Sequence, residues 1–198
     1  MEKKEMNSKD LLLSFLFSPG TTNKINEPII GRTKLTKMMF LFEKQIYKPF
    51  FQDEISIDLP LFEPYYFGPF SRQLFEDLSF FQSIGLVITE ETDIPLSTAD
   101  KVEFEEAFDE TDEWEAASFD EEEEKNELSY SLSKGGVAYV QEKIWGRFSQ
   151  SQRDKLQEFK KQINLISLDS LLRYVYNKYP EDARKSLIAD KYIKKEDE

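Results

Sequence analysis

The chain has 198 residues, a length that suits one domain with its own hydrophobic core. It contains no cysteine and no histidine, which excludes disulfide bonds, thiol and imidazole catalysis, and the usual zinc and copper ligands. The net charge of −13 is concentrated in residues 90–127, which hold 18 Asp and Glu against 2 Lys; the remaining 21 acidic and 24 basic residues give a net of +3. The acidity therefore belongs to one segment.

The first part of the chain predicts two helices. The apolar run KDLLLSFLF at 9–17 indicates a short helix that ends at the turn-forming SPGTTN. Thr33 is placed to cap a second helix over 33–48. Apolar residues recur along it with the spacing of one buried helical face: Leu35, Met38, Met39, Phe42 and Ile46.

The stretch PYYFGPF at 64–70 follows an extended segment and precedes a third helix, expected over 70–84. Proline is favoured at the first helical position, so Pro69 predicts the start of this helix, and Gly85 predicts its end. The four aromatic rings suggest either a stacking platform or a buried corner. We favour the corner, with Tyr65 and Tyr66 pointing to opposite sides of an extended chain.

The rest of the chain predicts a hairpin followed by helices. LVITEE at 86–91 and LSYSLSKGG at 128–136 alternate as strands do, and residues 90–127 form a long excursion between them. Successive helices are expected within a C-terminal extension over 134–188, with Ser149 and Asp169 as caps and one more helical turn after Pro180.

Helix, helix, extended segment, helix and hairpin is the order of a winged helix. We therefore predict an α+β fold: one mostly helical, winged-helix-like domain over 1–198, with a two-stranded wing that carries the acidic insert. Four segments carry a resemblance to the YwgA-like proteins and, more remotely, to the Panacea domain of SocA-type antitoxins. They are GRTKLTKMMFLFEK, YYFGPFSRQLFEDLSFFQSIGLV, YSLSKGG and SLDSLLRYVYNKYPEDARKSLI.

The resemblance implies a partner-binding module of toxin–antitoxin or phage-defence loci, with no catalytic residues to carry over. It covers roughly 31–89 and 128–188, so nothing about the acidic insert follows from it. The longest apolar run is too short to cross a bilayer, and we expect a cytoplasmic protein without a membrane association. No cofactor, metal site or placed pair of catalytic carboxylates is expected.

The acidic insert is the predicted partner-binding site. Four large aromatic residues stand among its carboxylates within sixteen positions, which favours an arm that buries rings on a protein partner with a basic surface. The alternatives are a nucleic-acid mimic and an inert, solvated wing tip. The candidate contact residues are Phe104, Phe108, Trp114, Phe119, Glu121, Glu122 and Glu123.

Basic residues near the second and third helices form a second candidate site. Their side chains could contact nucleic acid or an acidic partner, although a charge run of this kind is more often a solvated helix face. Glu76 and Asp77 make the third helix a poor reader of DNA. A DNA-binding transcriptional regulator is therefore the alternative to a non-catalytic protein-binding regulator. The candidate contacts are Arg32, Lys34, Lys37 and Arg72.

Overall fold

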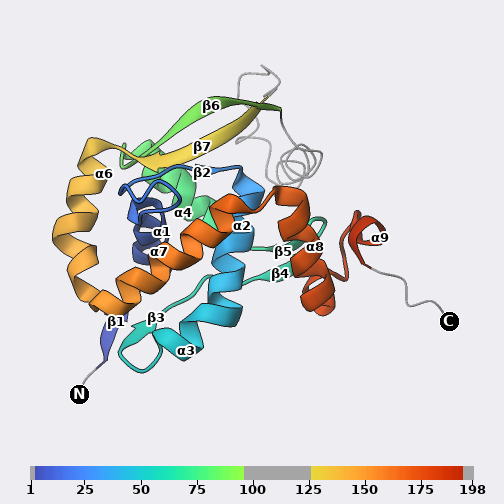
Figure 1. Cartoon of the computed structure of the whole chain (residues 1–198), viewed down its shortest axis with the longest axis horizontal. Helices are drawn as coiled ribbons and strands as arrows, with labels where there is room; N and C mark the ends of the chain where they lie inside the picture. The colour runs from blue at the N-terminus through green and yellow to red at the C-terminus, as the bar shows by residue number, and fades with distance from the viewer. Residues whose placement is uncertain (1–2, 96–125, 194–198) are drawn as a thin grey trace.

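The computed structural model describes residues 3–95 and 126–193 (Figure 1). It is an α+β fold, 56% helical with a few small sheets, so helices supply most of the core. No helix in the described ranges is both long and apolar enough to cross a membrane. The first elements are β1 (Lys4–Met6), α1 (Ser8–Phe17), β2 (Ile29–Ile30), α2 (Arg32–Leu41), η1 (Phe42–Tyr47), α3 (Lys48–Phe50) and β3 (Ile55–Ile57). The later ones are β4 (Glu63–Tyr65), β5 (Gly68–Phe70), α4 (Arg72–Ser83), β6 (Val87–Pro95), β7 (Asn126–Leu132), α6 (Lys134–Tyr139), η3 (Val140–Ile144), η4 (Trp145–Arg147), α7 (Gln150–Leu165), α8 (Leu168–Lys178), η5 (Pro180–Ala183) and α9 (Ala189–Tyr192).

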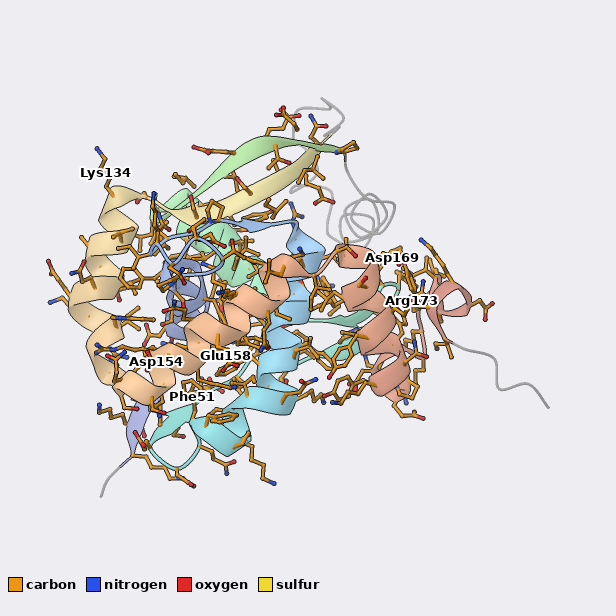
Figure 2. The ribbon with its side chains drawn as sticks, in the orientation of Figure 1. Phe51, Lys134, Asp154, Glu158, Asp169 and Arg173 are labelled. Atoms are coloured by element: carbon orange, nitrogen blue, oxygen red, sulfur yellow. The ribbon has the colours of Figure 1, made fainter. Side chains whose placement is uncertain are left out.

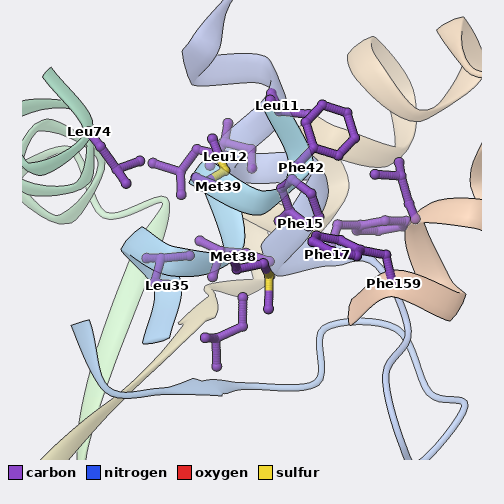
Figure 3. Close-up of a cluster of buried hydrophobic side chains, with 14 of the residues drawn as sticks. Leu11, Leu12, Phe15, Phe17, Leu35, Met38, Met39, Phe42, Leu74 and Phe159 are labelled. Carbon is purple, nitrogen blue, oxygen red and sulfur yellow. The ribbon is translucent and has the colours of Figure 1, made fainter. Parts of the chain in front are cut away.

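Helix α1 lies at the centre of the main core. Its residues from 11 to 17 are apolar except for Ser14, and all of them are buried, as expected for a helical segment without a polar face. The ring of Phe15 packs edge-on against Phe42 at 5.2 Å and contacts Phe159 of α7 at 5.9 Å (Figure 3). The short apolar helix predicted from KDLLLSFLF is confirmed.

Helix α2 has the predicted buried face but a different start. Gly31, with a left-handed φ of 86°, occupies the N-cap position, and Thr33 is buried within the first turn. The predicted cap at Thr33 is therefore wrong. Glycine adopts this backbone conformation without a Cβ penalty, which lets the chain turn from β2 directly into the helix.

The predicted hairpin is present, with an additional strand. β6 and β7 are antiparallel, and β2 pairs with the other edge of β7, with Ile29 opposite Tyr130. The two strands predicted for the wing therefore pair as expected, and β2, which was not predicted as a strand, makes the sheet three-stranded. Residues 96–125, which include the insert's candidate contact residues, lie outside the described ranges.

The PYYFGPF stretch forms a small hairpin instead of the first turn of a helix. β4 and β5 are antiparallel, with Pro64 opposite Pro69, and α4 begins only at Arg72 after Ser71, whose hydroxyl accepts a hydrogen bond from the Leu74 amide. The predicted helix start at Pro69 is wrong. Proline has no N–H group. Two facing prolines therefore suit a position in the hairpin at which neither residue donates a backbone hydrogen bond to the opposite strand.

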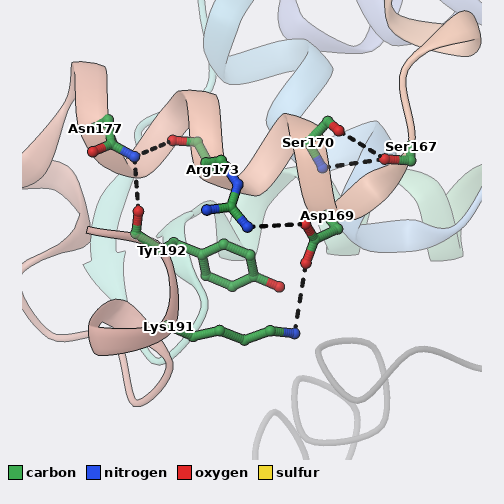
Figure 4. Close-up of polar contacts among 7 residues, drawn as sticks. All are labelled: Ser167, Asp169, Ser170, Arg173, Asn177, Lys191 and Tyr192. Carbon is green, nitrogen blue, oxygen red and sulfur yellow. Dashed lines mark hydrogen bonds and ion pairs between the residues drawn. The ribbon is translucent and has the colours of Figure 1, made fainter. Parts of the chain in front are cut away.

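Ser149 caps α7 as predicted, and a reciprocal bond with Gln152 completes a capping box. The predicted cap at Asp169 is wrong: Ser167 caps α8 by accepting a hydrogen bond from the Ser170 amide (Figure 4). Asp169 instead lies in the first turn of α8, where its carboxylate pairs with Arg173 at 3.4 Å and with Lys191 at 3.6 Å. The exposed pair with Lys191 joins α8 to α9.

A buried lysine holds the loop between α1 and β2. Nζ of Lys160, on α7, donates to the carbonyl oxygens of Leu16 (3.0 Å), Ser18 (2.7 Å) and Glu27 (2.6 Å). Desolvation by burial lowers the pKa of Lys160 to about 7, although the nearby Glu27 carboxylate opposes this shift. Sequence reasoning missed this residue, although it follows Leu156 by one helical turn on the buried face of α7.

Candidate ligand-binding groove

A cavity of about 480 Å³ lies beside the β4–β5 hairpin and the start of α4. The hairpin supplies aromatic side chains, the start of α4 supplies polar ones, and Lys185 closes the rim from the segment that follows η5. The volume is within the range of about 300 to 1,000 Å³ that is typical of small-molecule sites. The lining residues are Leu61, Glu63, Pro64, Tyr65, Tyr66, Phe70, Arg72, Gln73 and Lys185.

The aromatic side chains of this groove form a continuous row. Tyr65 lies between Tyr66, at a centroid distance of 4.5 Å, and Phe70, at 4.9 Å with ring planes 28° apart. Phe70 in turn contacts Phe75 of α4 at 4.8 Å. Tyr65 and Tyr66 were predicted to point to opposite sides, and this is wrong because both line the groove at a turn. The tight turn, rather than an extended strand, brings them together.

The hairpin is held from behind. Phe67 is buried in a second cluster with Leu172 and Tyr176 of α8. Gly68 has a left-handed φ of 83°, and a Cβ built there would lie 3.4 Å from the Tyr176 ring. The Tyr66 carbonyl oxygen accepts hydrogen bonds from the Leu187 amide at 2.9 Å and from the Ser186 hydroxyl at 3.0 Å. The backbone that carries the aromatic row is therefore anchored on two sides.

Three charged side chains of the groove are unpaired. Within residues 3–95 and 126–193, Arg72, Lys185 and Glu63 make no side-chain hydrogen bond or ion pair, although all three are exposed and line the same cavity. Two cations and one carboxylate give the groove a local excess of positive charge. This contrasts with the overall charge of −13.

The predicted basic contacts do not form one patch. Arg72 lies in the groove, and the guanidinium of Arg32 lies over Phe75 at 5.4 Å, beside the end of the aromatic row. Nζ of Lys34 is half-buried and donates to the Ile166 carbonyl; burial lowers its pKa, whereas Glu127 raises it. Lys37 is fully buried, with Nζ donating to the Pro69 carbonyl at 3.1 Å, so its predicted role as a surface contact is wrong.

The reason for burying Lys37 is the position of α2. Elements β5 and α8 cover the side of α2 that sequence periodicity assigns to solvent. Asp77 was likewise expected to face DNA, but it is buried and accepts a hydrogen bond from the Ser8 hydroxyl at 2.9 Å. Lys37 thus links α2 to β5, and Asp77 links α4 to α1.

The carboxylates of the described residues do not gather into a metal site. No group of three Asp or Glu side chains in the described ranges is placed to hold a metal ion. Asp154 and Glu158, one turn apart on α7 (Figure 2), interact with neighbours on the same helix: Asp154 with Gln150 and Glu158 with Lys155. Such pairs are ordinary on a helix surface.

Comparisons of the chain with protein-family models, with curated proteins and with solved structures found no match. Its function must therefore be argued from the arrangement of its own residues.

Proposed function

We propose that this protein is a non-catalytic regulator that binds a protein partner and is built on a winged-helix scaffold. The scaffold is supported by the order of α1, β2, α2, α4, β6 and β7 and by the pairing of β2 with β7. That pairing is expected when the first strand of a winged helix joins its wing. On this scaffold α4 takes the place of the recognition helix.

The observation that carries the functional proposal is the outer face of α4. Arg72 is the only Lys or Arg of this helix, and its exposed positions further along include Glu76, Ser79 and Phe80. A DNA-reading helix needs several Arg, Lys, Asn or Gln side chains directed at base edges, supported by contacts to phosphate. The exposed Phe80 suits a protein contact better, and the carboxylate of Glu76 would repel a phosphate backbone.

The acidic segment 90–127 supplies the proposed contact with a partner that has a basic surface. Phe104, Phe108 and Trp114 would be buried in the interface, and Phe119 and 121–123 would extend it with one ring and carboxylates. Such a protein would act as an antitoxin-like or defence-associated module that occludes or recruits its partner. This agrees with the resemblance to YwgA-like proteins and the Panacea domain.

The test is quantitative affinity capture from the native cell. A variant with Phe104, Phe108 and Trp114 all changed to alanine should lose the partner that the wild type enriches, because the anchoring rings are gone. Leu165→Ala is the matched control, since Leu165 is 68% exposed on α7 and belongs to neither candidate site. Full capture by the triple variant, with an unchanged melting temperature, would refute the proposal.

A DNA-binding regulator is the second candidate, favoured by the unpaired guanidinium of Arg72 at the first position of α4. A mobility-shift assay over a salt series separates the two functions, because affinity for phosphates falls steeply with salt. We expect no shift even at low salt. A salt-dependent shift that Arg72→Gln and Arg32→Gln both weaken would favour DNA binding instead.

A further inference from the structure

We propose that the groove beside the β4–β5 hairpin is a binding site for a nucleoside monophosphate. This inference goes beyond the proposed protein-binding function and does not depend on it. It rests on the cavity, on the aromatic row that lines it and on the unpaired charges at its rim.

The first argument is the aromatic surface. Tyr65, Tyr66 and Phe70 all line the cavity and contact one another in a row, in which Tyr66 is the end ring that a further planar ring would join. Aromatic side chains stack with nucleobases regardless of base identity, because every base has a π face. The exposed Leu61 and the half-buried Pro64 extend this apolar surface within the same cavity.

The second argument is the charge. Arg72 and Lys185 come from segments far apart in the sequence, yet both line this one cavity, and neither is neutralised by another described residue. A phosphate monoester is a dianion that would pair with both groups, and the planar fork of Arg72 suits two phosphate oxygens. The groove thus offers two cations to one terminal phosphate.

The third argument is Glu63, whose carboxylate also lines the cavity without a partner among the described residues. A purely anionic ligand would be repelled by it. A nucleotide also carries hydroxyl and amino donors, and a carboxylate accepts hydrogen bonds from such groups. The combination of rings, two cations and one acceptor therefore selects a nucleotide over inorganic phosphate alone.

The rigidity of the hairpin favours binding. Nζ of Lys37 donates a hydrogen bond to the Pro69 carbonyl oxygen on one side of the hairpin. The Ser186 hydroxyl and the Leu187 amide donate hydrogen bonds to the Tyr66 carbonyl oxygen on another side. A preformed surface loses little conformational entropy when a ligand binds. The groove does not have to be assembled by the ligand.

The experiment is isothermal titration of the full chain with AMP, adenosine and inorganic phosphate as probes. We expect saturable AMP binding with a dissociation constant on the order of 0.1 mM, and binding at least about tenfold weaker for either fragment. The variant Arg72→Gln/Lys185→Gln should weaken AMP binding about tenfold or more. Tyr66→Ala should weaken both AMP and adenosine.

The matched control is Arg184→Gln. Arg184 is exposed and adjacent to Lys185 in sequence but does not line the cavity, so its loss should change the AMP affinity less than about twofold. Circular dichroism and melting temperature establish that the surface variants stay folded. Equal AMP binding by the wild type and by Arg72→Gln/Lys185→Gln would overturn the proposal. Binding of a thymidine oligonucleotide at the same salt without AMP binding would also overturn it, because it would assign the groove to nucleic acid.

Discussion

Replacing Lys160 with methionine tests whether its buried amino group stabilises the fold. Methionine has a similar length and fills the same space, but it cannot donate a hydrogen bond. The carbonyl groups of Leu16, Ser18 and Glu27 would each lose a donor at 2.6 to 3.0 Å. Lys160 is fully buried, so water cannot readily replace the lost donor.

A buried acceptor left without a partner costs about 1 to 3 kcal/mol. The lower value applies here, because the variant no longer has to bury a polar amino group. With a pKa of about 7 the amine is mostly neutral at pH 8 and has two N–H groups for the three acceptors, so we expect Lys160→Met to lower the free energy of unfolding by about 2 kcal/mol near pH 8. This is a large fraction of the roughly 5 to 15 kcal/mol that stabilises a typical domain.

The cost should also depend on pH. The pKa of Lys160 is lowered to about 7 in the folded protein, from a model value of 10.5, chiefly by burial. Between these values the unfolded chain binds more protons than the folded one, so the stability of the wild type rises with pH through this window. Relative to Lys160→Met, the wild type should gain about 2 kcal/mol between pH 7 and pH 9.

Urea denaturation followed by circular dichroism at pH 7, 8 and 9 measures both effects. Lys161→Met is the control, since Lys161 is exposed on the same helix and its loss should change stability by less than about 0.5 kcal/mol. If Lys160→Met is as stable as the wild type at pH 8, the three carbonyl bonds contribute nothing. A cost that is the same at pH 7 and pH 9 would refute the lowered pKa.

Two further substitutions test the loop and the hairpin. Burial raises the pKa of Glu27, but hydrogen bonds from Thr22, Asn164 and Thr21 outweigh this and lower it to about 2. The stabilising effect of the Glu27 carboxylate is therefore present above about pH 4.5 and lost as the pH falls toward 2. After allowance for solvent screening, Glu27→Gln should lower the free energy of unfolding by about 1 to 2 kcal/mol at pH 6 and by almost nothing at pH 2. If the urea midpoints of the wild type and Glu27→Gln differ by the same amount at pH 6 and at pH 2, this prediction is contradicted. Gly68→Ala should lower stability by about 1 to 2 kcal/mol because of its left-handed φ, measured by thermal denaturation. Gly146→Ala, where an added Cβ meets nothing within 4 Å, should be close to neutral, and equal melting temperatures for both variants would contradict the strain at Gly68.

The sequence predicts the helices well where one face is apolar and the opposite face is polar. Leu35, Met38 and Met39 are buried as their spacing indicates, because that spacing reflects a single contact surface. The same reasoning fails for Lys37 and Asp77, which it assigns to solvent. Further elements cover these positions, and no local pattern reports a neighbour that is distant in sequence.

Short strands and the groove could not be predicted for the same reason. β2 has only two residues, Ile29 and Ile30, and its pairing with β7 depends on how α1 and α2 bring it there. The residues that line the groove lie between positions 61 and 185 of the sequence. Whether Arg72 and Lys185 form ion pairs depends on which carboxylates the fold places near them. The PYYFGPF motif did mark the location, but its aromatic content alone did not separate a ligand surface from a buried corner.

In the structure the motif has one packed side and one side that lines the groove. Its inner side, Phe67 and Gly68, packs against Tyr176 and fixes the hairpin to α8, whereas its outer side presents Tyr65 and Tyr66 to the groove. A tight turn sends neighbouring residues to different surfaces, so one short segment can anchor itself and still expose rings. The buried contacts of the hairpin thereby hold the exposed rings in a fixed position, which is the property that a recognition surface requires.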